Sequence, residues 1–572
     1  MLLIKLRFLT KYHNPDLQFQ KMDFNSKLKK SQPPLIQQED NDVDFYNNIL
    51  TDGLQYEYAI KSGEIDPDRY KRTKTKYPKN VIIIGAGMSG LVAAYELEQV
   101  GHQTTVIELS GRVGGRVKTI HDFSNGLHAE GGAMRLSPNQ FLTKHYIDLF
   151  QIPTRPFKNK NEKGLLHLYG KTITLKEWEE NNKDWTNFFW PGWDENLTPE
   201  DKEEAGIEGI LDLYEKTIEP VKNEILEDHS KEGWKKWVAK WSKMSMLDFF
   251  RSEQYQDSPG PKLRPWTEQA ILAYKVSGYR PILEISMVEY LRDELGGWWL
   301  DNLYTPTNGM SDLPEHFILP NKFGWNKDVN LLNRIHFGIR VESVEVDKDT
   351  HKVIVKGSNS TTGKEVSILP GDAVIITLPL TILRQLKLPL TTDQQKALAD
   401  ITYEPSTKVL MQFRERFWQD QVGQGGFTKT DLPIGQIHYP DWDDSELTSK
   451  DRGILVSYTW GQDALIFGSQ PKDLAVASAI RILKQIHDET DEYFEHGTVQ
   501  AWFSDSAAQG AFAYLHPYEY NNSMAALQTS HHPIYLAGEA ISWANGWIQG
   551  ALMSGLNAAF DFYSHNEQDS RN

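Results

Sequence analysis

Residues 81–90 read VIIIGAGMSG, four apolar residues typical of a buried strand that lead directly into a GxGxxG turn and a helical pattern. Each of the three glycines in such a turn has its own role. Gly85 permits the tight turn, Gly87 lets the backbone approach a diphosphate, and Gly90 lets the helix pack closely on the strand. Eighteen residues after Gly90, Glu108 ends a second apolar strand, where it can accept hydrogen bonds from ribose hydroxyls. This spacing predicts a βαβ dinucleotide-binding unit, with the diphosphate at the helix N-terminus.

A second glycine-arginine cluster follows at once, because residues 111–116 read GRVGGR. Its backbone N–H groups and the guanidinium groups of Arg112 and Arg116 are suited to binding phosphate. A basic loop on the surface would give the same composition. The βαβ pattern alone does not separate NAD from FAD, and this cluster is the first feature that distinguishes them.

Further motifs show a resemblance to a known family. Residues 131–138 read GGAMRLSP, 309–314 read GMSDLP, 535–539 read YLAGE, 545–548 read NGWI and 554–559 read SGLNAA. In this order the motifs resemble the flavin amine oxidase superfamily, and within it the FAD-dependent L-amino acid oxidases. The resemblance spans roughly residues 40–566. It implies one FAD, and no second GxGxxG is present.

Composition narrows the classes of function. The chain has 572 residues and a net charge of 61 − 78 = −17, which argues against binding to nucleic acid. It contains no cysteine, so disulfides, thiolate metal sites and a cysteinyl-flavin bond are excluded, and the FAD should be noncovalent. We predict no metal site. No run approaches the ~20 apolar residues of a membrane span. The N-terminus lacks a convincing signal peptide, so the protein is expected in the cytoplasm or secreted by another route.

The pattern of elements predicts an α/β fold. A Rossmann-like, discontinuous FAD-binding domain of the glutathione-reductase type is expected at 77–121, 305–402 and 529–566. A mixed-sheet substrate-binding domain is expected at 41–60, 122–160 and 403–528, and a helical domain at 161–304. Residues 1–40 are expected to form a flexible arm. Trp234, Trp237 and Trp241 recur at helical spacing, and we interpret them as core residues on one helix face.

Five residues are expected to carry the chemistry implied by the resemblance. Arg135 matches the arginine that pairs with the substrate carboxylate, for which a planar guanidinium is well suited. Tyr458 matches the tyrosine that shares this clamp, with Trp460 two residues on along the same strand face. Lys408 matches the lysine that holds a water near flavin N5. Gly546 and Trp547 match the pair at the substrate amine.

The resemblance also implies a set of cofactor-binding residues. Glu539 should bind the ribityl and diphosphate region, and the backbone of Val341 should pair with adenine. The complete predicted set is Gly85, Gly87, Met88, Ser89, Gly90, Glu108, Gly115, Arg116, Gly132, Ala133, Met134, Arg135, Val341, Gly538, Glu539, Gly546, Trp547 and Ile548. The stretch 290–299 lacks the histidine of some animal relatives, and His438, His531 and His532 are predicted to be loop residues.

The predicted activity is the FAD-dependent oxidative deamination of L-amino acids to 2-oxo acids, ammonia and hydrogen peroxide, by hydride transfer from Cα to flavin N5. The partners are an amino-acid substrate and O₂, with a homodimer expected by family analogy. The alternatives are a tryptophan-type amino-acid 2-monooxygenase, a polyamine or monoamine oxidase, and a noncatalytic FAD-binding protein. The sequence does not decide which side chains are preferred, because an acidic residue such as Asp293 and aromatic walls are both available.

Overall fold

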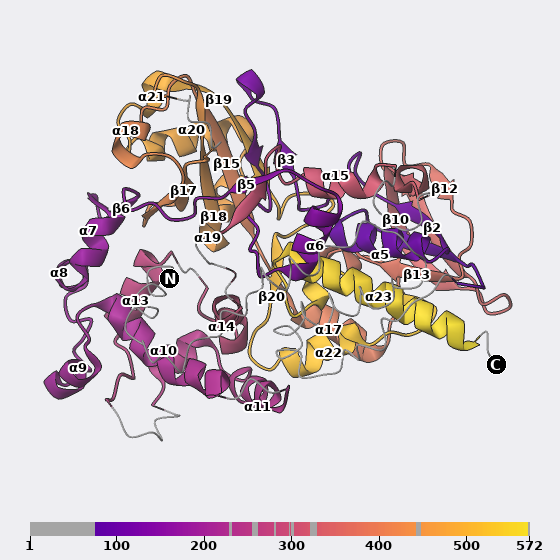
Figure 1. Cartoon of the computed structure of the whole chain (residues 1–572), viewed down its shortest axis with the longest axis horizontal. Helices are drawn as coiled ribbons and strands as arrows, with labels where there is room; N and C mark the ends of the chain where they lie inside the picture. The colour runs from indigo at the N-terminus through magenta and orange to yellow at the C-terminus, as the bar shows by residue number, and fades with distance from the viewer. Residues whose placement is uncertain are drawn as a thin grey trace.

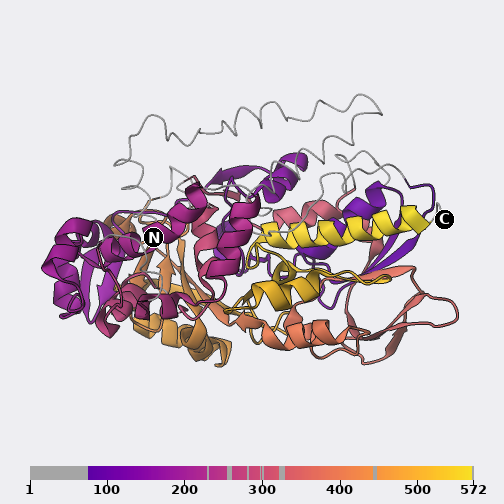
Figure 2. The same cartoon turned by 90° about the horizontal axis from the view of Figure 1, so that it is seen from below.

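The computed structural model describes residues 75–569 except 228–230, 254–260, 280–281, 297, 299–301, 321–328 and 442–447. The predicted arm at 1–40 and the substrate-domain segment at 41–60 therefore lie outside the described residues. The molecule is elongated (Figure 1). A five-stranded sheet with its helices lies at one end of the long axis, and a seven-stranded sheet and a group of helices lie at the other (Figure 2).

The five-stranded sheet is parallel throughout and has the order β21-β13-β1-β2-β9. Its strands are β1 (Asn80–Ile84), β2 (Gln103–Ile107), β9 (Ile335–His336), β13 (Ala373–Ile376) and β21 (Ile534–Leu536). The apolar residues of β1 and β13 are fully buried, as is typical of the strands of a parallel sheet. The predicted dinucleotide-binding sheet is thus present, assembled from strands far apart in the sequence.

Two helices pack closely over this sheet and run side by side (Figure 1): α5 (Met88–Gln99) and α23 (Ile548–Asp569). A Cβ on Gly90 would lie 1.9 Å from the carbonyl oxygen of Gly85, so no side chain fits where α5 meets β1. A Cβ on Gly555 would lie 2.1 Å from the carbonyl oxygen of Ser89. Gly90 has the packing role that the sequence predicts for the third glycine of the turn.

Smaller elements surround the parallel sheet. An antiparallel sheet is formed by β10 (Ile339–Val346), β11 (Val353–Asn359) and β12 (Glu365–Ser367). Short pairs join β3 (Thr119–Ile120) to β4 (Ala129–Glu130), β5 (Thr154–Pro156) to β8 (Tyr304–Pro306), and β14 (Thr402–Glu404) to β20 (Phe512–Tyr514). The helices are α6 (Phe141–Leu149), α15 (Asp312–Ile318), α16 (Leu380–Leu383), α17 (Thr392–Asp400) and α22 (Ala525–Gln528).

The second sheet is mixed and has the order β19-β15-β18-β17-β16-β6-β7. Its strands are β6 (Leu165–Leu168), β7 (Lys171–Thr174), β15 (Ser406–Phe413), β16 (Phe427–Thr430), β17 (Gln436–His438), β18 (Gly453–Trp460) and β19 (Phe494–Ala501). The helices beside it are α18 (Gln419–Val422), α19 (Gly461–Gly468), α20 (Lys472–Leu483) and α21 (Thr490–Tyr493).

The helical region begins later than the sequence predicts. Residues 165–174, which the sequence assigns to the helical domain, form β6 and β7, because β6 pairs in parallel with β16 and β7 then forms the edge of the second sheet. A capping box at Thr174 then starts the first helix. The helices are α7 (Leu175–Glu180), α8 (Asn182–Phe189), α9 (Pro199–Ala205), α10 (Ile210–Glu227), α11 (Lys231–Trp241), α12 (Met246–Arg251), α13 (Glu268–Ser277) and α14 (Met287–Leu295).

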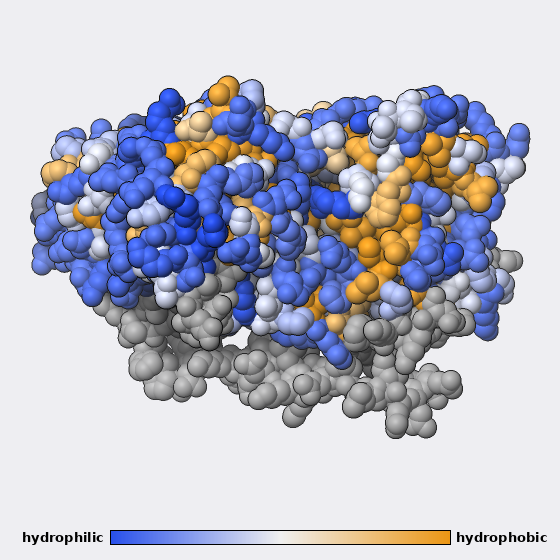
Figure 3. Space-filling view, turned by 90° about the horizontal axis from the view of Figure 1, so that it is seen from above, coloured by the Kyte–Doolittle hydropathy of each residue, from blue (hydrophilic) through white to orange (hydrophobic). Residues whose placement is uncertain are grey.

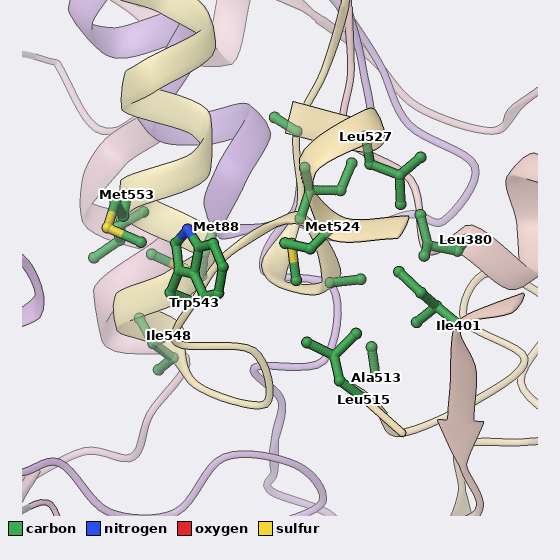
Figure 4. Packing of buried hydrophobic residues seen from close by; sticks show 14 of the residues in the cluster. Met88, Leu380, Ile401, Ala513, Leu515, Met524, Leu527, Trp543, Ile548 and Met553 are labelled. Atoms are coloured by element: carbon green, nitrogen blue, oxygen red, sulfur yellow. The ribbon is translucent and has the colours of Figure 1, made fainter. Parts of the chain in front are cut away.

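Apolar packing joins these parts. Trp237 and Trp241 on α11 are buried in the main core, as the sequence predicts. Figure 4 shows the same core at the start of α23, where the indole of Trp543 lies beside Met88 and Ile548. The N-terminal ends of α5 and α23 are thereby held close together. Burial of large side chains such as Trp543 is the main stabilising contribution here.

The face of the molecule drawn in Figure 3 is mainly hydrophilic. Hydrophobic groups gather in a band on its right half and in a smaller group at the upper left of centre. No helix within the described ranges has the length and apolar character that a membrane crossing requires.

The close approach at Gly90 gives a test of the fold. We expect Gly90→Ala to lower the free energy of unfolding by about 1–3 kcal/mol or more, because its methyl group would overlap a backbone oxygen. Urea unfolding of the cofactor-free protein measures this. Gly87→Ala is the matched control, since a Cβ there meets nothing within 4 Å. Equal stability of the two variants would contradict the packing argument.

Candidate functional site

A cavity of about 1160 Å³ opens at the carboxyl ends of the parallel strands. Gly85, Glu108, Thr377 and Gly538 follow β1, β2, β13 and β21, and all four line it. This is the edge of an open α/β sheet at which ligands bind. The structure brings together at this cavity all the predicted site residues except Gly90, which packs behind its wall.

One end of the cavity is shaped for a close backbone approach. Gly85 has φ +106, a conformation that favours glycine. A Cβ on Gly87 would extend into open space at the wall of the cavity, and no side chain caps the N-terminus of α5 here. The unpaired N–H groups of this helix end suit an anion.

Glu108 is fixed beside this helix end. Its Oε2 accepts a hydrogen bond from the Ala86 N–H (2.8 Å), and its Oε1 accepts bonds from the N–H and Oγ of Ser110 (2.8 Å each). Val341 on β10 lines the same cavity. Glu108 is therefore held in one orientation at the end of β2, where the sequence predicts contact with a ribose.

The glycine-arginine loop uses its two arginines differently from each other. The guanidinium of Arg112 donates to the carbonyl oxygens of Val113 (3.0 Å), Val117 (3.1 Å) and Gly115. Arg112 therefore holds its own loop at the wall of the cavity. Arg116 instead crosses to the last segment of the chain, where Nη1 lies 2.6 Å from Oε1 of Glu539.

Glu539 joins three segments that line the cavity. Besides Arg116, its carboxylate accepts hydrogen bonds from the N–H groups of Gly546 (2.7 Å) and Ala513 (3.3 Å). Gly546 has φ +80, so a side chain would strain this turn. The ion pair is largely buried, and breaking it by removing one partner should be costly.

Several polar and aromatic side chains surround Lys408 at the other end of the cavity. The register of β15 and β18 places Lys408 opposite Tyr458, and Nζ lies 4.6 Å from the centroid of the tyrosine ring. Arg135 donates to Oδ1 of Asn159 (3.1 Å), and Trp460 lies edge-on to Tyr458 with the ring centroids 4.9 Å apart. Cationic, phenolic and indole groups thus share one wall.

Lys408 itself is almost completely buried. Its Nζ donates to the carbonyl oxygens of Gly132 (2.7 Å) and Glu130 (3.1 Å) and lies 3.6 Å from Sδ of Met134. The pKa of Lys408 is lowered to about 7, chiefly by burial; the charge of Glu130 opposes this shift and that of Arg135 adds to it. Burial also raises the pKa of Glu130 to about 7, against the effect of hydrogen bonds and of Lys408.

Trp547 faces an acidic side chain on the opposite wall. Its indole Nε1 lies 3.2 Å from both carboxylate oxygens of Asp293, and its ring packs edge-on against Trp298. Sequence reasoning left the role of Asp293 open. The structure shows that it orients the indole that was predicted to form a wall of the substrate site.

A buried network on α14 supports this wall and was missed by sequence reasoning. Arg292 donates to the carbonyl oxygens of Trp543 (2.7 Å) and Asn545 (2.6 Å), and Glu289 accepts from Nδ2 of Asn545 (2.7 Å). Burial raises the pKa of Glu289 to about 7, and the adjacent Arg292 opposes this shift. The signal in the sequence was the spacing of Glu289, Arg292 and Asp293 on one helix turn.

The prediction that His438 lies in a loop was wrong. It ends strand β17, is buried, and its ring centroid lies 6.0 Å from that of Tyr458. Burial lowers its pKa well below the usual value, and the positive charges of Arg135 and Lys408 lower it further. His438 is thus a neutral side chain behind the tyrosine.

The comparison with protein families agrees with this geometry. The model of the flavin-containing amine oxidoreductases matches residues 88–561. The chain belongs to this family. As a family member it uses a flavin cofactor and is an oxidoreductase.

Two relatives and one solved structure illustrate the similarity of this flavin amine oxidoreductase. An L-amino-acid oxidase of Sistrurus catenatus edwardsii is 30% identical over 509 residues, 87% of this chain and 89% of the relative. A putative L-amino-acid oxidase of Bacillus subtilis (strain 168) is 26% identical over 85% of this chain and 95% of its own. A putrescine oxidase redesigned in its cofactor binding has a TM-score of 0.59 at 18% identity over 85% of this chain and 99% of its own, which shows a similar fold.

The open space at Gly87 gives a test of cofactor binding. We expect Gly87→Ala to fold with unchanged stability, because φ is −74 and nothing lies within 4 Å of its Cβ. Its flavin affinity should fall at least about tenfold, because the methyl group would occupy the space of a closely approaching diphosphate. Fluorescence titration of the cofactor-free variant with FAD measures this. Wild-type affinity would contradict the assignment of this turn.

Proposed function

We propose that this flavin amine oxidoreductase is an FAD-dependent L-amino acid oxidase. The reaction is L-amino acid + H₂O + O₂ → 2-oxo acid + NH₃ + H₂O₂. The observation that supports it most is the position of Arg135, which lines the cavity together with Tyr458 and Lys408. A planar guanidinium at that wall suits a carboxylate, which L-amino acids carry and simple amines lack.

In this proposal the side chains orient the substrate. Arg135 and Tyr458 hold its carboxylate, and the carbonyl oxygen of Gly546 accepts a hydrogen bond from its amine. The indoles of Trp547 and Trp460 confine the side chain and exclude water, which strengthens the polar contacts. Their ring contacts with Trp298 and Tyr279 keep both indoles in place. Holding Cα in one orientation is the main catalytic contribution of these residues.

We further propose that FAD binds noncovalently. The chain has no cysteine for a thioether bond. The helix end at Gly87 would take the diphosphate, Glu108 the ribose, and Glu539 with Arg116 the adjoining polar groups. The bound flavin would supply the hydride acceptor. We also propose that the protein is a homodimer and that the chain is divided into FAD-binding, substrate-binding and helical domains.

The rival functions predict different outcomes. A 2-monooxygenase would use the same carboxylate clamp but form an amide. A polyamine or monoamine oxidase would have no use for Arg135. A noncatalytic FAD-binding protein would bind flavin without being reduced by any amine. The product and the substrate dependence of flavin reduction therefore separate the four.

Anaerobic reduction is the direct test. We expect the flavin absorbance of the purified holoenzyme to bleach with a subset of L-amino acids, but not with D-alanine, tyramine or spermidine. The 2-oxo acid, identified after aerobic turnover, separates an oxidase from a monooxygenase. Bleaching by carboxylate-free amines alone would overturn the proposal, and no bleaching by any compound would favour a binding protein.

The carboxylate clamp is tested by two substitutions. We expect Arg135→Lys to lower kcat/KM for the best L-amino acid by about 10–100-fold, because it loses one of two charge-assisted hydrogen bonds. Tyr458→Phe should lower it by about 2–10-fold, the contribution of one neutral hydrogen bond. The decarboxylated analogue of the same amino acid should show no such loss. Equal losses for both compounds would rule out a carboxylate contact.

A further inference from the structure

A second, smaller cavity lies behind Lys408. It has a volume of about 60 Å³ and lies between β4, β17 and the segment after β5. The titratable residues that line it are His128, Glu130, Arg155, Lys158, Lys408, His438, Tyr439 and Asp441. None of the predicted roles uses this space, and its concentration of titratable groups is unusual for a void in a protein core.

Lys408 and Met134 form the wall between the two cavities, because both residues line each of them. The ammonium group of Lys408 lies at this wall, with two of its bonds directed to the carbonyl oxygens of Gly132 and Glu130. Lys408 is thus positioned to exchange a proton with either side.

The second cavity has room for water. A buried water needs about 10–15 Å³ by this measure, so about four waters fit, and the polar lining offers them hydrogen-bond partners. The cavity also approaches the outside, because its lining includes the exposed Lys158 and the half-buried Arg155 and Asp441. Water inside can therefore exchange protons with solvent without passing the substrate.

Glu130 lines this cavity together with Lys408. Protein encloses the side chain, so its partial exposure is to the cavity that it lines. One carboxylate oxygen accepts from the Met310 N–H (3.0 Å), and the other accepts from Oγ1 of Thr119 (3.0 Å). No ion pair within 4 Å joins Glu130 to Lys408 in the described part of the chain, so a proton passing between them needs an intervening water.

We propose that the second cavity is a water-filled proton path to the active site, in which Glu130 is the positioning residue that returns a proton to Lys408 during reduction of O₂. The inference rests on the proposed function. In this proposal protons reach the active site through the second cavity, whereas the substrate enters through the first. Lys408, at the inner end of the path, contacts the reacting atoms. Glu130 does not contact them and acts through Lys408.

O₂ would receive two electrons from the amino acid by way of the bound cofactor, and it needs two protons to become H₂O₂. One of these protons would be supplied by the reduced cofactor. For the other, an Nζ–H bond of Lys408 breaks and an O–H bond of the peroxide forms. A cavity water then carries a proton from the Glu130 carboxyl group to Nζ, and solvent water returns one to Glu130.

The matched pair Glu130→Gln and Glu404→Gln tests this path. The amide of Glu130→Gln retains an acceptor for the Met310 N–H but cannot relay a proton. Glu404 is a second buried glutamate whose pKa burial raises to about 7, and it lines neither cavity. Stopped-flow absorbance measures anaerobic bleaching by an L-amino acid and, separately, reoxidation of the reduced protein by O₂, both from pH 5.5 to 9.

We expect Glu130→Gln to lower the rate of reoxidation by O₂ at least about tenfold, because a step assisted by proton transfer loses its proton donor. The rate of anaerobic bleaching should change less than about threefold. Glu404→Gln should change neither rate. Slowing of both half-reactions by Glu130→Gln would overturn the path in favour of a structural role. Absence of bleaching in the wild type would instead contradict the proposed function, so the two failures are distinguishable.

A spectroscopic titration adds a readout that needs no turnover. The titratable groups around Lys408 and Glu130 are Arg135, Arg155, Lys158, His128, His438, Tyr439, Asp441 and Tyr458. Glu130 raises the pKa of Lys408, so Glu130→Gln should move the pH midpoint of the resting flavin spectrum to lower pH. Ala129→Leu, which fills the cavity without changing charge, should slow reoxidation and leave that midpoint in place. An unmoved midpoint in Glu130→Gln, or normal reoxidation in a folded Ala129→Leu, would overturn the proposal.

Discussion

The site depends on two close contacts of α5, one with the turn at Gly85 that precedes it and one with the neighbouring helix α23. Both contacts are made by glycines, because a Cβ on Gly90 or on Gly555 would lie about 2 Å from a backbone oxygen, at 1.9 and 2.1 Å respectively. This spacing sets the N-terminal end of α5 next to the segment that leads into α23. Gly87 and Gly546, distant in the sequence, consequently line the same cavity.

Buried ion pairs and hydrogen bonds then hold in place the segments that backbone packing brings together. Glu539 binds Arg116 from the first segment and the Gly546 N–H from the last, and Arg292 with Glu289 holds Asn545 just before it. Each of these groups is costly to bury alone and acceptable only with its partners in place. The turn at 545–547 is therefore specified by two buried polar networks from opposite sides, which explains how Trp547 is held without a regular element of its own.

The sequence predicted best those features that depend on neighbours along the chain. The turn at Gly85, the strand that leads to Glu108 and the alternation that places Tyr458 beside Trp460 are local patterns, and the structure shows each one. Features decided by distant partners were missed. Strand β6 exists because it pairs with β16 some 260 residues later, with Lys429 opposite Leu166, and Arg112 binds its own loop although its surroundings suggest phosphate.

His438 and Glu130 show the same limit at the active site. Neither residue belongs to a motif with a predicted role, and each acquires its character only from burial beside Lys408. Burial shifts the pKa values of Lys408 and Glu130 toward each other, because it lowers that of the lysine and raises that of the carboxyl group. A proton therefore passes between them at a lower cost in free energy than between an exposed lysine and glutamate, which would keep their charges. The enclosure that makes both groups expensive to bury is therefore also the property that suits them to proton transfer.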